Sequence, residues 1–287
     1  MTIIHITISM KNILLPVALM LHLTVFSQYY YTDLVDARLI NDRMKNLTAQ
    51  KVKLITATGY DAAGAKTSDF SERQEVDGEK KSINITSRNG QQVNRQYYQF
   101  DNDYRLTSVT DSSDGIKTVT SYAYDNNGNI TSIKTAVKDS LQDFIETIEH
   151  QYQYNTVGKP ERLLRILNGK DSSEYRFTLE EHKNVADEQL FRRGVGYDRV
   201  YYYYDDKNRL TDVVRYNKKA QKLLPTMMFE YDDTGRIIQK LTVVSADNPD
   251  YLIWRYLYDA KGLKTKEALF NKNKELTGRI EYTYAFQ

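Results

Sequence analysis

Aromatic residues recur in pairs, two positions apart, from residue 98 to the end of the chain. Side chains separated by two residues point to the same face of a β-strand. Equivalent members of successive pairs lie 23 to 30 residues apart, a period typical of repeat architectures. The eight pairs are Tyr98/Phe100, Tyr122/Tyr124, Tyr152/Tyr154, Tyr175/Phe177, Tyr202/Tyr204, Phe229/Tyr231, Tyr256/Tyr258 and Tyr282/Tyr284. This pattern predicts a series of strands that each carry two rings on one face.

A polar segment typical of a tight turn follows most of the pairs. These segments share an initial Asp and a final Gly or Asn: Asp125–Gly128, Asp205–Asn208, Asp232–Gly235 and Asp259–Gly262. Asp accepts hydrogen bonds from the turn backbone, and Gly or Asn tolerates the positive φ of a type I turn followed by a bulge. Each returning strand has apolar residues three apart, such as Leu106 and Val109. This spacing means either that the first residue belongs to the turn or that a bulge separates the two.

Two strands and two turns per unit predict an antiparallel meander of about sixteen strands over residues 51–287. Twist accumulates in wide sheets, and open sheets beyond about ten strands curl or split. The expected fold is therefore mostly β: a long twisted or coiled antiparallel β-meander of hairpin repeats, coiled or partly closed, with one short N-terminal helix.

The helix is expected within residues 28–50, where Val35, Leu39, Ile40, Met44 and Leu47 follow helical spacing. Thr32 or Asp33 is expected to cap its start. We expect the apolar stripe to cover an otherwise open sheet edge or end. The alternative is a membrane-surface or partner helix, although its polar face mixes both charge signs.

Residues 1–27 resemble a secretory signal peptide. An apolar run over residues 12–26 follows Lys11, and small residues precede Gln28, where cleavage is expected. The alternative is a retained N-terminal anchor. The signal peptide predicts an exported chain, periplasmic or at the cell surface, without a transmembrane span after cleavage. Because the sequence has no cysteine, we expect no disulfides.

Charge and histidine content argue against several functions. Loss of Lys11 with the signal leaves 39 Lys and Arg against 38 Asp and Glu, so no nucleic-acid partner is expected. Only His150 and His182 remain after residue 27, without the spacing of a zinc site or a catalytic triad. The acidic turns lack the final Glu of a calcium loop. We expect no catalytic residue, metal or cofactor.

The segment Phe229–Ile237 has the pattern aromatic-x-Tyr-Asp-x-x-Gly-Arg-Ile and resembles the YD repeat of the RHS family. The resemblance extends over about residues 98–287. Members of that family include bacterial polymorphic-toxin shells and extracellular teneurins, and they fold as spiralling antiparallel β strips. This chain is far shorter than a full shell. The resemblance therefore implies the repeat fold and an exported role, not encapsulation, and the layout also resembles small secreted proteins of Bacteroidota.

The tyrosines are the main candidates for a binding role. Stacked aromatic pairs form either the core of the repeats or a surface that binds glycan or peptide. Four consecutive tyrosines must place two rings on each face. The candidate ligand-binding residues are Tyr201, Tyr202, Tyr203, Tyr204, Tyr256 and Tyr258.

We therefore expect a non-enzymatic binding or structural protein at the cell envelope or outside the cell, whose partner is a protein or polysaccharide. One alternative is a glycan-acting hydrolase that uses carboxylates and Tyr on a concave face. Another is an outer-membrane barrel, although strands such as Arg255–Tyr258 do not keep charge off both faces.

Overall fold

The computed structural model describes residues 29–139, 144–243 and 250–287. The expected signal peptide lies outside this part of the chain. The described residues form one helix and 18 strands. Their bounds are α1 (Tyr30–Ala49), β1 (Val52–Asp61), β2 (Lys66–Asp77), β3 (Ser82–Asn89), β4 (Gln92–Phe100), β5 (Leu106–Ser113), β6 (Ile116–Tyr124), β7 (Ile130–Asp139), β8 (Phe144–Tyr154), β9 (Pro160–Leu167), β10 (Asp171–Leu179), β11 (Val185–Arg192), β12 (Val195–Tyr204), β13 (Leu210–Asn217), β14 (Lys222–Tyr231), β15 (Ile237–Val243), β16 (Tyr251–Tyr258), β17 (Lys264–Phe270) and β18 (Leu276–Phe286).

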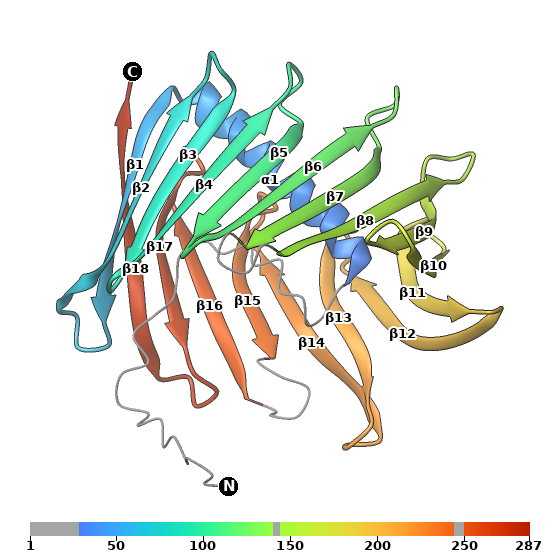
Figure 1. Ribbon diagram of the computed structural model, residues 1–287. Coiled ribbons are helices and arrows are strands. Elements are labelled where there is room, and N and C mark those ends of the chain that lie inside the picture. The colour runs from blue at the N-terminus through green and yellow to red at the C-terminus, as the bar shows by residue number, and fades with distance from the viewer. Residues whose placement is uncertain (1–28, 140–143, 244–249) are drawn as a thin grey trace, which may run out of the picture.

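The strands form a closed antiparallel barrel (Figure 1). Each strand pairs with its neighbours in sequence, and β1 also pairs with β18, with Ile55 opposite Tyr284. The mostly β composition, the antiparallel order and the single helix are confirmed, but the expectation of a coiled meander is wrong because the two ends of the sheet meet. Closure pairs both edges, which would otherwise expose unsatisfied backbone groups.

The turns follow the chemistry of the repeated Asp-x-x-Gly segments. Gly128, Gly235 and Gly262 have φ values of 83°, 87° and 75°, and Asn208 has a φ of 59°. The returning strands begin with a bulge, since Phe100 pairs with Leu106 while Gln99 pairs with Ser108. Of the two explanations for the spacing of Leu106 and Val109, the bulge is therefore correct.

Helix α1 lies inside the barrel, between the wall formed by β2–β8 and the wall formed by β12–β18 (Figure 1). The expectation that it covers an open edge is wrong, because the closed sheet has no open edge. Its buried residues are Tyr30, Ala37, Met44 and Leu47, whereas Leu39, expected in the apolar stripe, is 43% exposed. Met44 and Leu47 belong to one hydrophobic cluster, and Tyr30 and Ala37 belong to another. The helix therefore joins two cores.

The aromatic pairs face the barrel interior. Tyr98, Tyr152, Tyr202 and Tyr282 are all less than 10% exposed. Rings buried on the same face of successive strands contribute apolar area and cross-strand contacts. Of the two roles considered for the aromatic pairs, the structure shows that these rings form the core.

Candidate functional site

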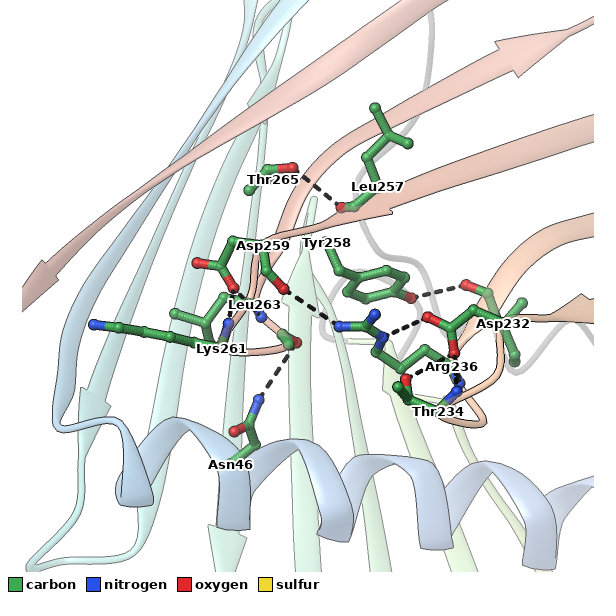
Figure 2. A network of polar contacts seen from close by, with 12 residues as sticks. Asn46, Asp232, Thr234, Arg236, Leu257, Tyr258, Asp259, Lys261, Leu263 and Thr265 are labelled. Carbon is green, nitrogen blue, oxygen red and sulfur yellow. Dashed lines mark hydrogen bonds and ion pairs between the residues drawn. The ribbon is translucent and has the colours of Figure 1, made fainter.

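The Asp, Gly and Arg of the turn at residues 232–236 build a network of polar contacts, which Figure 2 shows around Asp232. Asp232 Oδ1 accepts the N–H groups of Thr234 and Arg236 at 3.0 and 2.9 Å, and Oδ2 accepts Arg236 Nε at 2.7 Å. Burial favours the protonated acid, but these hydrogen bonds prevail and hold the pKa of Asp232 below its usual range. Both oxygens of the carboxylate thus accept hydrogen bonds from residues of the same turn.

The same arginine connects one repeat to the next. Arg236 donates to the backbone oxygen of Asp259 at 3.3 Å, and its guanidinium lies 5.0 Å from the centre of the Tyr258 ring. The Tyr258 hydroxyl in turn donates to the backbone oxygen of Ile237 at 2.9 Å (Figure 2). Equivalent contacts join Arg209 to Tyr231. The residues of the repeat motif therefore hold neighbouring hairpins together.

A different polar site holds the start of the helix. Glu188 on β11 accepts the N–H groups of Tyr30 and Tyr31 through its two carboxylate oxygens, at 3.1 and 3.0 Å. The residue before the helix, Tyr29, provides no side-chain cap. Glu188 is 2% exposed, and burial raises its pKa to about 7. An acid from a distant strand takes the place of a local helix cap.

Asp33 connects the first turn of the helix to β8. Its Oδ2 lies 3.0 Å from His150 Nδ1 and accepts the Tyr152 hydroxyl at 3.2 Å. The Tyr152 hydroxyl also donates to the backbone oxygen of Tyr30 at 2.9 Å. The Tyr30 ring contacts the His150 ring edge-on, with centroids 4.9 Å apart. We call Asp33, His150, Tyr152 and Glu188 the helix seat.

Neither Glu188 nor His150 belongs to a recognisable motif in the sequence. The period-two pattern does place His150 on the same strand face as Tyr152. Nothing local indicates Glu188, because it meets the helix across 158 residues of sequence.

A cavity of about 70 Å³ lies beside the helix seat. It is lined by Tyr175, Glu188, Leu190, Asp198, Val200 and Arg215. This volume accommodates a few water molecules and is too small for a sugar ring.

The six candidate tyrosines do not form one surface. Tyr202 and Tyr204 face inward, and Tyr202 is 3% exposed. Tyr256 and Tyr258 are also on the inner face, where burial raises the pKa of Tyr258 to about 12. Tyr201 and Tyr203 point outward, and Tyr203 is 49% exposed.

The two outward tyrosines belong to a larger apolar surface on β12–β14. Tyr203 and Met228 lie on either side of Asp212, which is the cross-strand partner of both. The side chains of Tyr203 and Met228 are exposed. Tyr216 pairs with Leu223, at 56% and 45% exposure. We define the outer aromatic patch as Tyr201, Tyr203, Tyr216, Leu223 and Met228. Exposed apolar groups of this kind mark interaction surfaces more often than single exposed residues do.

Comparison with known proteins supports the resemblance to RHS repeats. The family model "RHS Repeat" matches residues 105–139, which include the turn at Asp125. No curated protein matches the sequence.

Several solved structures are similar over most of the chain at low identity. A porin-like protein from Bacteroides uniformis is 11% identical, with a TM-score of 0.37, covering 82% of this chain and 97% of that one. A porin-like protein from Bacteroides vulgatus is 11% identical, with a TM-score of 0.28, covering 82% and 98%. The complex TcdB2-TccC3-TEV is 13% identical, with a TM-score of 0.30, and the match covers 76% of this chain and 16% of that one. In the described part of the chain, no helix has the length and apolar character needed to cross a membrane.

Proposed function

We propose that the protein is an exported, non-enzymatic binding module of the cell envelope, which contacts a protein or polysaccharide through the outer aromatic patch. The observation that carries this proposal is the outward orientation of Tyr201 and Tyr203, beside Tyr216 and Met228, on a barrel whose interior is filled. Tyrosine rings present apolar area together with a hydroxyl, which suits recognition of sugars and peptides. The N-terminal sequence supports export.

The interior supports a structural role. Asp232 is hydrogen-bonded within its own turn. Glu188 is hydrogen-bonded to the helix, and Asp33 is hydrogen-bonded to β8. The helix and the aromatic pairs fill the space that a concave site would need. The barrel is therefore a rigid support for its outer surface.

One observation favours the alternative of a glycan-acting hydrolase. Glu188, with a pKa raised to about 7 by burial, shares the small cavity with Asp198. Both oxygens of Glu188 already accept helix N–H groups, so a proton-transfer role would require the helix to move. Hydrolysis of any glycan by the mature chain, and its loss in Glu188→Gln with retained fold, would favour this alternative over the binding module.

The proposal is tested with a glycan and peptide array probed with the mature chain, residues 28–287. We expect a ligand whose affinity falls roughly tenfold in Tyr203→Ser and in Met228→Ser, since central aromatic and apolar contacts dominate binding energy. Leu257→Ser is the matched control, because Leu257 is an exposed apolar residue on β16, outside the patch. A ligand that tolerates both patch substitutions would refute the assignment of the patch.

A further inference from the structure

A single row of residues crosses the outer face of the barrel from β2 to β7. Every member lies directly opposite the next one on the neighbouring strand. The row consists of Arg73, Thr86, Arg95, Ser112, Lys117 and Lys138, and we call it the cation row. It contains four cations, two hydroxyl groups and no carboxylate.

The arrangement places like charges side by side. Lys117 and Lys138 are direct cross-strand partners, and like charges placed opposite each other destabilise a sheet. Arg73 is paired with Glu75 at 3.0 Å. Among the residues that the structure describes, Arg95, Lys117 and Lys138 form no ion pair. These exposed cations are therefore free to pair with an anionic ligand.

Three of the four cations lie along a groove. A hollow of about 380 Å³ is lined by Arg95, Ser112, Lys117 and Lys138, together with the hairpin between β5 and β6. One carboxylate, Asp114, lies in that hairpin and accepts the Gln92 amide at 2.7 Å. The groove is therefore positively charged, with a single acid at its margin.

The next outward row offers groups that suit sugar hydroxyls. Tyr97 is opposite Asn84 on one side and Thr110 on the other, and the residue is 38% exposed. An amide and a hydroxyl both donate and accept hydrogen bonds, and a tyrosine ring offers a face for stacking.

From these two rows we infer that the β2–β7 face binds an anionic polysaccharide, carboxylated or sulfated, that lies across the strands along the cation row. Adjacent strands are about 4.8 Å apart, so the cations of β4, β6 and β7 recur within roughly 15 Å. A linear polymer with charges along its length matches this spacing around a convex wall. This site is distinct from the outer aromatic patch and goes beyond the proposed function.

Two other anionic partners fit the surface less well. Nucleic-acid binding is typical of a concentrated basic domain, whereas the mature chain is nearly neutral, with 39 Lys and Arg against 38 Asp and Glu. An anionic membrane surface requires apolar anchors among its cations, and this row places Thr86 and Ser112 between them.

The test measures binding of polygalacturonate and dextran sulfate to the mature chain by calorimetry, with neutral dextran as the reference. We expect binding to at least one anionic polymer and not to dextran, weakening as salt screens the charges. The triple variant Arg95→Gln/Lys117→Gln/Lys138→Gln should lose roughly tenfold or more in affinity. The matched control, Lys170→Gln/Lys218→Gln/Lys219→Gln, changes the net charge equally at exposed turn residues and should stay within about twofold.

A stability measurement separates a lost ligand contact from a damaged fold. Lys138→Gln removes the repulsion with Lys117, so the variant should bind more weakly while its urea midpoint is unchanged or higher. The assignment is overturned if neither anionic polymer binds, if the two triple variants lose affinity equally, or if single-stranded DNA or anionic vesicles bind more tightly than both polymers. These results leave the outer aromatic patch untouched, because its own test uses Tyr203→Ser and Met228→Ser.

Discussion

The two ends of helix α1 are held in different ways. Near its C-terminus, Met44 and Leu47 are at most 2% exposed and lie in a cluster with Val52, Ile55 and other apolar residues of β1–β5, β17 and β18. Near its N-terminus, Tyr30 and Ala37 also lie in an apolar cluster, but there the helix seat adds a buried carboxylate and hydrogen bonds. Apolar burial is non-directional, so it holds the C-terminal end inside the barrel without fixing its orientation. Hydrogen bonds are directional, so they also fix the orientation of the N-terminal end.

Both ends have a buried acid, but the acids differ in what surrounds them. Glu72 accepts the Gln74 amide at 2.5 Å, and the charges of Lys264 and Arg43 partly offset the effect of burial on its pKa. Glu188 receives backbone N–H groups, and the nearby charge of Asp33 adds to the effect of burial. The free energy of unfolding should therefore fall when a buried apolar side chain is shortened near the C-terminal end of the helix, and when a buried carboxylate is removed near the N-terminal end.

The largest expected effect is at the apolar end. Met44→Ala should lower the free energy of unfolding by about 2–5 kcal/mol, because the side chain is fully buried and its loss leaves a cavity. Urea denaturation followed by circular dichroism measures the change, which should be the same at pH 5 and pH 7. Leu39→Ala, at an exposed position of the same helix, should change stability by less than about 0.5 kcal/mol. Equal effects of the two substitutions would contradict the assigned burial.

Glu188→Ala should cost roughly 2–4 kcal/mol, because it leaves the buried N–H groups of Tyr30 and Tyr31 without an acceptor. Urea denaturation and proteolysis between the helix and β1 should both detect the loosened helix. Glu181→Ala removes an exposed acid from the preceding turn and should have little effect on stability. If Glu188→Ala is as stable as the wild type, the helix seat does not anchor the helix.

The pH dependence of stability reports on the buried acids, since burial raises the pKa of Glu72 as well as that of Glu188. Burial raises the pKa of Glu188 from 4.5 to about 7 and that of Asp36 from 3.8 to about 6. The folded state therefore holds more protons than the unfolded state in this interval, and the free energy of unfolding should fall as pH rises from about 4.5 to about 7. The share of Glu188 is on the order of 3 kcal/mol.

Urea denaturation at pH values from 4 to 8 checks this slope, with Glu188→Gln as the comparison variant. The variant should lose the share of the slope that belongs to Glu188 and keep the shares of Asp36 and Glu72, whose pKa values burial also raises. The turn carboxylates act in the opposite direction. Hydrogen bonds lower the pKa of Asp232, so the stability that its carboxylate contributes is lost only in stronger acid. A wild-type profile that rises from pH 5 to pH 7 would be inconsistent with a buried, protonatable Glu188.

Local sequence predicted the repeat well, because its chemistry is contained within a few residues. Asp232 and Gly235 are three positions apart, and the turn they form depends on nothing distant. Period two placed Tyr202 and Tyr204 on one face but did not indicate which face is inside. The inward direction became clear only with closure of the barrel.

The helix seat could not be predicted in the same way. Thr32 or Asp33 was expected to cap the helix, but the helix begins at Tyr30, and Thr32 Oγ1 donates back to the Tyr29 oxygen. Asp33 instead contacts His150, 117 residues away, and the cap comes from Glu188. Those partners are specified by the shape of the closed sheet, which single-residue preferences do not encode.

The smallest effect tests how the turn network supports the apolar end. Arg236 donates to the Asp259 oxygen, and the same turn accepts Asn46 from the helix through the Gly262 oxygen at 3.4 Å (Figure 2). Asp232→Ala should cost about 1–2 kcal/mol, because it removes the acceptor of two backbone N–H groups and of Arg236.

Asp233→Ala is the matched control, since Asp233 is the next residue and is exposed. It should stay within about 0.5 kcal/mol of the wild type in urea denaturation. Equal losses at both positions would mean that net charge, and not the turn geometry of Asp232, stabilises the repeat. A loss confined to Asp232 that becomes smaller as the pH falls below 3.8, the ordinary pKa of Asp, would tie the effect to the ionised carboxylate, because protonation of the unfolded chain then cancels part of the stability that the lowered pKa of Asp232 provides.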